Sequence, residues 1–166
     1  MRSLPDPGFA GDDGAVSPDV ASALASYDAD PDARHSATLA VLQGARLLVP
    51  VVAVLGEVEV DEQGLAHDKT SDMAAVLMRG RDGRNALLAF TGSQAMARWD
   101  PQARPVPVSA RDAARAARQD GAEALLVDVA GPVMFVVEGE DLEALAEGWT
   151  LAEVRTGAWG WVRPDQ

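Results

Sequence analysis

The stretch from Met73 to Asp100, MAAVLMRGRDGRNALLAFTGSQAMARWD, constrains the fold more than any other part of the chain. Two apolar runs, 74–79 and 86–91, flank Asp82 and Gly83. Asp-Gly between apolar runs is a strong signal for a tight turn that joins two paired strands. The stretch therefore predicts a β-hairpin.

A short helix is predicted directly after this hairpin. Residues 91–93, Thr-Gly-Ser, offer hydroxyl groups that can cap a helix. Met96 and Trp99 then fall on one helical face, and Pro101 stops the helix. We expect Trp99 to anchor the short helix on the sheet.

Three further apolar runs complete a predicted sheet of five strands, at 46–55, 74–79, 86–91, 124–129 and 133–137. The run 46–55 is apolar enough for a central strand, in which Pro50 marks a bend, a bulge or an unpaired position. Residues 57–61 alternate like a strand with one wet face, whereas 62–72 has no periodicity and predicts a loop. Two prolines hold 104–108 near polyproline or edge-strand geometry.

Capping residues and prolines mark the starts of the other predicted helices. Ser17 and Asp30 each precede a proline, a pattern that predicts two N-terminal helices. Ser109, with Asp112 three residues later, opens an Ala-rich helix. A last helix is predicted from Gly139.

Together these elements predict an α+β protein, with a mostly antiparallel or mixed central sheet of about five strands and helices packed on it. We expect a flexible N-terminal tail at 1–16 and a single domain at 17–150. Residues 151–166 are expected as a C-terminal tail, in which Trp159 and Trp161 alternate as they would in a closing strand.

The composition excludes several classes of site. There is no cysteine, so disulfides, thiolate zinc sites and cysteine nucleophiles are excluded. No apolar run approaches the roughly 20 residues of a membrane helix, and the first residues show no signal-peptide core. We therefore expect a cytoplasmic protein without a cofactor. Its net charge of −12 argues against nucleic acid and anionic membranes as partners.

Positive charge is concentrated in one block of the chain. Between residues 79 and 118, eight Arg stand against three Asp, a net charge of +5 that leaves −17 for the remainder. Seven of these arginines form the candidate binding set: Arg79, Arg81, Arg84, Arg98, Arg111, Arg115 and Arg118. The last three lie on one side of the Ala-rich helix. A solvated helix face is one interpretation of this stripe, and recognition of an acidic partner is the other.

The order of motifs is similar to that of a known family. GARLLVPVV, then the stretch from Met73 to Pro101, then PVPVSARDAARAA and AGPVMFVVEGEDL resemble the SseB family, named for enhanced serine sensitivity. The resemblance covers roughly residues 4–148. It implies a small α/β domain without an established reaction or cofactor. The N-terminal domain of this family is also described as related to type III secretion, so the resemblance implies that relation as well.

Other candidate sites have simpler explanations. His35 and His67 lie in separate neighbourhoods, and no Ser/His/Asp order is present. Residues 91–93 could hold an anion through backbone N–H groups, but they also suit simple helix capping. Oxygen ligands for a hard cation could come from Glu57, Glu59, Asp61, Glu62 and Asp68. The spacing of the first three is that of a wet sheet edge, so we expect no metal site and no catalytic residue.

These observations favour a non-enzymatic module that binds an unidentified protein partner or its own copy. One alternative is binding or turnover of a small anionic metabolite at an Arg-lined site. Another is a component associated with a secretion apparatus. A concave pocket that contains arginine would favour the metabolite, whereas a broad, partly apolar face would favour a protein.

Overall fold

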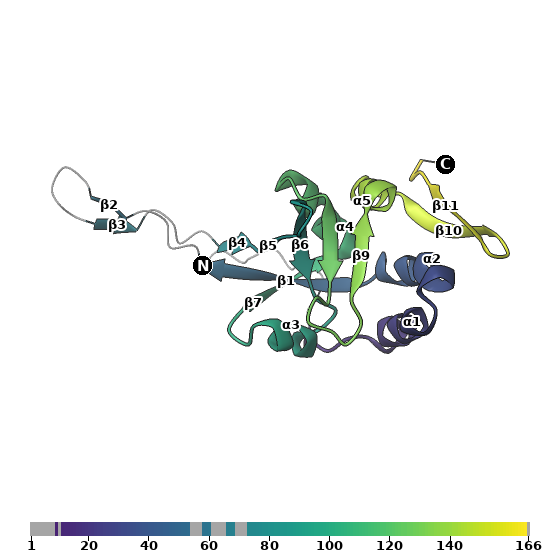
Figure 1. Ribbon diagram of the computed structural model, residues 1–166, viewed down its shortest axis with the longest axis horizontal. Helices are drawn as coiled ribbons and strands as arrows, with labels where there is room; N and C mark the ends of the chain where they lie inside the picture. Colours follow the sequence, from purple (N-terminus) through teal and green to yellow (C-terminus); the bar gives the residue numbers. More distant parts are fainter. Residues whose placement is uncertain (1–8, 10, 54–57, 61–65, 69–72, 166) are drawn as a thin grey trace.

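The computed structural model describes residues 9, 11–53, 58–60, 66–68 and 73–165, and these form an α+β structure as predicted (Figure 1). The helices are α1 (Pro18–Ala29), α2 (Pro31–Leu42), α3 (Ser93–Trp99), α4 (Ala110–Gln119) and α5 (Gly139–Ala146). The strands are β1 (Arg46–Ala53), β2 (Val58–Val60), β3 (Ala66–Asp68), β4 (Met73–Ala75), β5 (Leu77–Arg79), β6 (Asn85–Ala89), β7 (Arg104–Ser109), β8 (Ala124–Val127), β9 (Phe135–Glu138), β10 (Thr150–Arg155) and β11 (Ala158–Val162). No described helix is long and apolar enough to cross a membrane.

The prediction of one central five-stranded sheet is wrong. The described strands form separate sheets, in the orders β5-β6-β8-β9, β4-β1-β7, β2-β3 and β10-β11. The run 74–79 was predicted as one strand, but it changes partner at Val76, so β4 pairs with β1 and β5 pairs with β6. An apolar run shows that a segment is buried without showing what it pairs with, because pairing depends on distant residues.

The segment between β1 and β4 also departs in part from the prediction. Residues 66–68 form β3, which pairs with β2, although 62–72 was predicted as a loop. Predictions made for 54–57, 61–65 and 69–72 fall outside the described residues.

The predicted turn between β5 and β6 is confirmed. Gly83 has φ of 83°, a conformation that suits glycine because it has no Cβ. The Asp82 carboxylate accepts a hydrogen bond of 3.0 Å from the Arg84 backbone N–H, and Leu77 pairs with Leu87 across the hairpin. The Asp-Gly signal therefore fixes this turn locally.

Strands β6 and β8 are parallel neighbours, whereas β8 and β9 are antiparallel. The chain passes through α3, β7 and α4 between β6 and β8. The carboxyl ends of both parallel strands consequently lie at one edge of the sheet, beside α3 (Figure 1). In open α/β sheets this edge is where ligands commonly bind.

Strand β1 accommodates Pro50 because the proline nitrogen faces a gap in the hydrogen bonding. The Leu48 N–H donates to Phe90 on one side of β1, and alternate residues face the same side. The Pro50 nitrogen therefore points to that side too. It lies between the Leu48–Phe90 bridge and the pairing with β4, which begins at Val51, so it faces no carbonyl of a described strand that would need an N–H donor. The same alternation turns the nitrogens of Pro105 and Pro107 in β7 toward the open edge. The predicted edge geometry of 104–108 is confirmed.

The four-stranded sheet is buried on both faces. In β6, Leu87 and Ala89 belong to the main core, while Leu88 belongs with Phe90 to a smaller cluster under α3. Trp99 packs half-buried against this smaller cluster, with its ring centroid 5.7 Å from that of Phe90. The short helix is thus held on the second face of the sheet, as its apolar spacing predicts.

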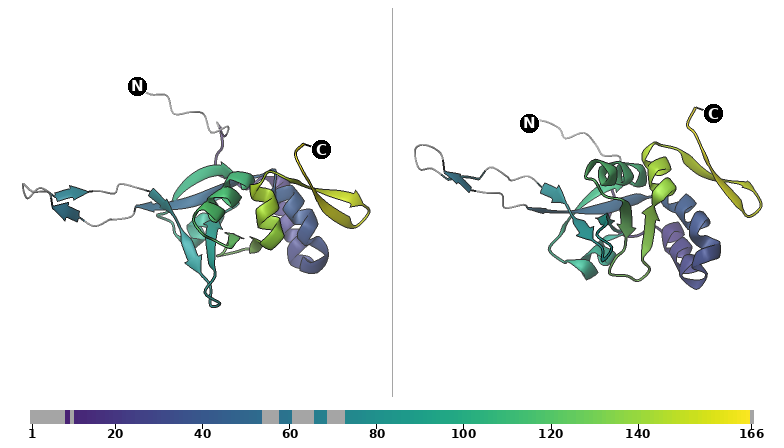
Figure 2. Two further views of the ribbon diagram at one scale, coloured as in Figure 1. Left: turned by 90° about the horizontal axis from the view of Figure 1, so that it is seen from above. Right: turned by 45° about the horizontal axis from the view of Figure 1, so that its top comes forward.

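The remaining helices begin where their capping signals predict. Ser17 and Asp30 are the N-caps of α1 and α2, which pack against each other. The Ser109 hydroxyl accepts the Asp112 backbone N–H at 3.0 Å and begins α4. Buried alanines cover the inner side of α4: Ala110, Ala113, Ala114 and Ala117. This small-residue face lets α4 lie close to the sheet and to α5 (Figure 2).

The C-terminal residues form the β10–β11 hairpin, which lies beside α2 and α5 in the views of Figures 1 and 2. Leu151 is buried in the main core, and Trp159 and Trp161 are packed half-buried against it. The Gln43 side chain donates to the Leu151 carbonyl at 2.9 Å and accepts from its N–H at 2.8 Å. This pair of bonds ties the hairpin to the end of α2.

Candidate functional site

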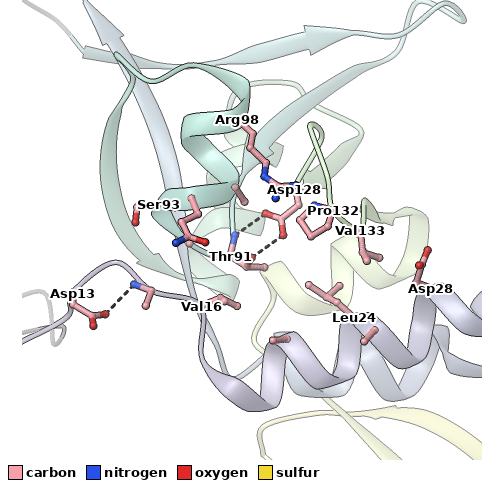
Figure 3. A pocket seen from close by; sticks show the side chains of 16 residues that line it. Asp13, Val16, Leu24, Asp28, Thr91, Ser93, Arg98, Asp128, Pro132 and Val133 are labelled. Atoms are coloured by element: carbon pink, nitrogen blue, oxygen red, sulfur yellow. Dashed lines mark hydrogen bonds between the residues drawn. The ribbon is translucent and has the colours of Figure 1, made fainter.

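A pocket of about 610 Å³ lies at the carboxyl ends of β6 and β8 (Figure 3). It lies between α1, α3, the turn after β8 and the segment that precedes α1. Its apolar lining comes from Ala15, Val16, Ala21, Leu24, Ala25, Ala95, Pro132 and Val133. Polar groups at the pocket belong to Asp13, Asp28, Thr91, Ser93, Gln94, Arg98 and Asp128. The volume falls within the range of about 300–1,000 Å³ that is usual for small-molecule sites.

Asp128 is the buried acid of the pocket, with 1% of its surface exposed. Its two carboxylate oxygens accept hydrogen bonds from the Thr91 backbone N–H at 2.8 Å and the Thr91 hydroxyl at 2.7 Å. Burial raises the pKa of the Asp128 carboxyl, against the opposing effect of the Thr91 bonds. Because Thr91 follows β6 and Asp128 follows β8, this contact joins the ends of the two parallel strands.

The backbone at Asp128 is in the left-handed region, with φ of 56°. Asp and Asn are the residues other than glycine that most readily adopt it. The chain turns there, and the Gly131 N–H donates to the Asp128 carbonyl at 2.9 Å. This turn carries Pro132 and Val133 to the wall of the pocket (Figure 3).

The segment before α1 is fixed over the pocket by Arg46. The Arg46 Nε lies 2.7 Å from Asp12 Oδ2, and its Nη2 donates to the Ala15 carbonyl at 2.7 Å. Its Nη1 donates to the Thr91 carbonyl at 3.0 Å. One guanidinium group therefore connects the start of β1, the end of β6 and the N-terminal segment.

The same segment occupies the N-terminus of α3. The Gly14 carbonyl accepts the Ser93 N–H at 2.7 Å, and no side chain caps the helix, so the expected hydroxyl capping by residues 91–93 is wrong. A Cβ at Gly92 would lie 2.9 Å from the Val16 backbone nitrogen. Only glycine permits such an approach, because real Cβ atoms do not come so close to another chain segment.

The candidate arginines are distributed over three places. Arg79, Arg81 and Arg84 are exposed at the β5–β6 hairpin, where Arg84 forms ion pairs with Asp82 at 2.8 Å and Glu138 at 3.2 Å. Hydrogen bonds from the Arg84 backbone and side chain lower the pKa of Asp82. Arg84 is therefore paired with carboxylates of its own domain.

The second place is α4, which carries Arg111, Arg115 and Arg118 toward the end of α5. Arg115 Nε donates to the Ala146 carbonyl at 2.8 Å, and Arg111 Nη2 donates to the Trp149 carbonyl at 3.4 Å. Cationic side chains at a helix C-terminus satisfy its free carbonyls and interact favourably with its dipole. The stripe thus has a structural role, although the Arg115 and Arg118 side chains remain 52% and 45% exposed.

The third place is the pocket, where Arg98 stands apart from the other arginines. Figure 3 shows its guanidinium group directed from α3 into the pocket, toward Asp128. Arg84, Arg115 and Arg118 each pair with a carboxylate, whereas Arg98 forms no ion pair or hydrogen bond through its side chain with any described residue.

Of the two histidines, His35 lies in a polar contact between elements. His35 Nε2 lies 3.2 Å from Asp141, which also accepts the Trp161 indole N–H at 3.0 Å. The His35 ring stacks on Phe135 with centroids 4.9 Å apart, so this cluster connects α2, α5 and β11. Among the described residues no group of three or more His, Cys, Asp or Glu could hold a metal ion. Of the sequence candidates, Glu57, Asp61 and Glu62 lie outside the described residues.

Sequence reasoning did not single out Asp128, Arg46 or the N-terminal segment. The signal for Asp128 was an acid directly after the apolar run ALLV, just before a Gly-Pro turn. We predicted 124–129 as continuous strand, whereas β8 ends at Val127. Arg46 is the first residue of β1, and no nearby sequence pattern indicates that its side chain contacts Asp12, Ala15 and Thr91.

Comparison with known proteins adds a family but no close relative. No curated protein and no solved structure gives a significant match to the chain. The model of the SseB protein N-terminal domain matches residues 20–144, most of the chain, including β6, β8 and the turn that carries Asp128. The resemblance found in the sequence is thereby confirmed, and the chain belongs to the SseB N-terminal domain family.

Proposed function

We propose that this domain binds a small molecule in the pocket between α1, α3 and the turn after β8. The observation that carries the proposal is the pocket itself, a mainly apolar cavity of about 610 Å³ with a few polar groups. Ligand sites typically combine such apolar walls with a small number of polar groups that fix orientation. Three separate segments of the chain are positioned to form it: 13–28, 91–98 and 128–133.

Binding is proposed because Asp128, the buried acid of the pocket, has a structural role. Both Asp128 oxygens accept hydrogen bonds from Thr91, so this carboxylate holds the two strand ends together. The proposed setting is the cytoplasm, which the sequence pattern favours.

A steric block tests the proposal. Ala25 lines the pocket from an exposed position on α1, and Ala29 is exposed one turn later without lining it. We expect 2-naphthylmethanol, a neutral apolar probe, to shift the backbone NMR signals of Thr91 and Ser93 in the wild type and in Ala29→Trp. Ala25→Trp should abolish these shifts. Equal shifts in all three proteins, or none in the wild type, would contradict the proposal.

A second candidate function is recognition of an acidic protein, or of another copy of the chain, by the α4 stripe. It is supported by the exposed fractions of Arg115 and Arg118 and by the net charge of −17 outside the basic block. Opposite charges on two surfaces orient their encounter and increase the association rate. The two functions use different faces and are separable by mutation.

A further inference from the structure

We propose that the ligand of the pocket is an apolar molecule with a single carboxylate group, which Arg98 binds. This inference rests on the proposed function and specifies its ligand class. It depends on Arg98, the cationic side chain among the described residues that line the pocket, and on the groups that surround it.

Arg98 has the properties of an anchoring group. Its guanidinium is directed into the pocket and forms no ion pair or hydrogen bond with a described residue (Figure 3). Guanidinium offers five N–H donors in a planar fork that matches a carboxylate in a two-bond arrangement. Arg98 is exposed, so it would pair with a carboxylate in contact with water; charge-assisted pairs of this kind are nevertheless stronger than neutral hydrogen bonds.

Asp128 does not compete for Arg98 as a free carboxylate would. Thr91 supplies a donor to each Asp128 oxygen, and Asp128 forms no ion pair with Arg98. Burial also raises the pKa of Asp128, which favours its uncharged form. The positive charge of Arg98 therefore remains available to a ligand.

The rest of the pocket limits the ligand to one acidic group. Val16, Leu24 and Val133 present apolar surface away from Arg98, and Asp28 projects from α1 at another side (Figure 3). A second carboxylate near Asp28 would meet a like charge, which is unfavourable in a partly enclosed site. An apolar body with one anionic end fits this distribution.

Three probes that share one ring system test the inference: 2-naphthoate, 2-naphthylmethanol and 2-naphthylmethylammonium. Their dissociation constants would be measured by NMR titration on the full chain. We expect naphthoate to bind roughly 10–100-fold more tightly than the alcohol, the range that one charge-assisted contact supplies. The ammonium probe should bind most weakly.

Variants of the arginine identify its role. Arg98→Gln should remove the preference for naphthoate while leaving the affinity for the alcohol unchanged, and Arg98→Lys should keep part of the preference. Arg81→Gln is the matched control, because Arg81 is exposed at the β5–β6 turn, outside the pocket.

The outcomes separate the two proposals. If the alcohol binds and Ala25→Trp blocks it, but naphthoate has no advantage or Arg98→Gln keeps it, the carboxylate inference is wrong and the pocket function stands. If the ammonium probe binds most tightly, the inference is likewise overturned. If no probe binds in the pocket, both proposals fail.

Discussion

At the scale of single residues, Asp128 is the group on which the geometry of the pocket depends. It joins the ends of two parallel strands through Thr91, and its own left-handed backbone turns the chain toward Pro132. A buried acid in this position has a pH-dependent effect on stability.

The first prediction concerns that pH dependence. Burial raises the pKa of Asp128 above its ordinary value of 3.8, so the folded state retains the proton to higher pH than the unfolded chain does. The stability that Asp128 contributes is then complete below pH 3.8 and is lost as the pH rises through the raised pKa. Asp128→Asn cannot ionise and tolerates the same backbone conformation. Urea unfolding should show Asp128→Asn gaining stability relative to wild type as the pH rises from about 4 to 7.

The control for this experiment is Asp120→Asn, at the exposed end of α4. Its stability relative to wild type should be nearly constant over the same pH interval. If Asp128→Asn and wild type gave parallel curves, Asp128 would have no linkage to folding.

The second prediction concerns the Thr91 hydroxyl. Thr91→Val keeps the shape of the side chain and removes the donor to Asp128 Oδ2. An unsatisfied buried acceptor costs about 1–3 kcal/mol, so the free energy of unfolding should fall by that amount. Thr91→Ser retains the hydroxyl and should lose less. A Thr91→Val protein as stable as wild type would show that water replaces the hydroxyl.

At the scale of elements, local signals predicted where helices begin and long-range partners escaped prediction. The side-chain caps at Asp30 and Ser109 act within three residues, and Pro18 directly follows Ser17 at the start of α1, so the sequence alone located these helix starts. The partner change at Val76 depends on β1 and β6, which no local pattern specifies. The pocket escaped prediction for the same reason, since its walls come from three segments distant in sequence, 13–28, 91–98 and 128–133.

The basic block shows a related limit of sequence reasoning. Net charge along the sequence placed seven arginines in one candidate set, and the fold separates Arg98 from the arginines of α4 and of the β5–β6 hairpin. Only Arg98 of the candidate set reached the pocket. The net charge of a stretch of sequence counts its charged residues, but it does not show which of them lie on the same surface of the fold.

The third prediction concerns the N-terminal segment. Arg46→Met removes the ion pair to Asp12 and the hydrogen bonds to Ala15 and Thr91. The segment should then leave the α3 N-terminus, because among the described residues it keeps there only the Ser93 N–H to Gly14 hydrogen bond and the van der Waals approach of Val16 to Gly92. Amide hydrogen exchange at Ser93 should accelerate at least tenfold, equivalent to about 1.4 kcal/mol. Exchange in β8 should be unchanged, and uniform acceleration throughout would indicate global destabilisation instead.

The fourth prediction concerns the anchor of α3. Trp99 is half-buried against Phe90, so Trp99→Ala should cost about 2–3 kcal/mol, below the 3–5 kcal/mol usual for a fully buried aromatic residue. Thermal unfolding would measure the loss. A melting temperature equal to that of wild type would mean that α3 is held without Trp99.

At the scale of the whole molecule, the α4 stripe connects stability with association. Replacing Arg111, Arg115 and Arg118 together by Gln removes donors to the Ala146 and Trp149 carbonyls. We expect a loss of about 1–3 kcal/mol, because carbonyls at the end of α5 lose charged partners. If the stripe also binds an acidic partner or a second copy, size exclusion should show a complex that weakens with salt and is absent for the triple variant. Identical elution of both proteins at low and high salt would leave the stripe a purely structural role.

The family match spans residues 20–144, yet two features beyond it complete the molecule. On one side the segment held by Arg46 supplies Asp13, Ala15 and Val16 to the pocket; on the other, β10 supplies Leu151 to the core. The residues that match the family model and the residues that pack together in the fold therefore have different boundaries. Two proteins can share the matched residues and still differ in the N-terminal segment that forms one wall of the pocket. If the pocket binds a ligand as proposed, a change in that segment alone would alter the pocket wall while the sheet and its buried acid stay unchanged.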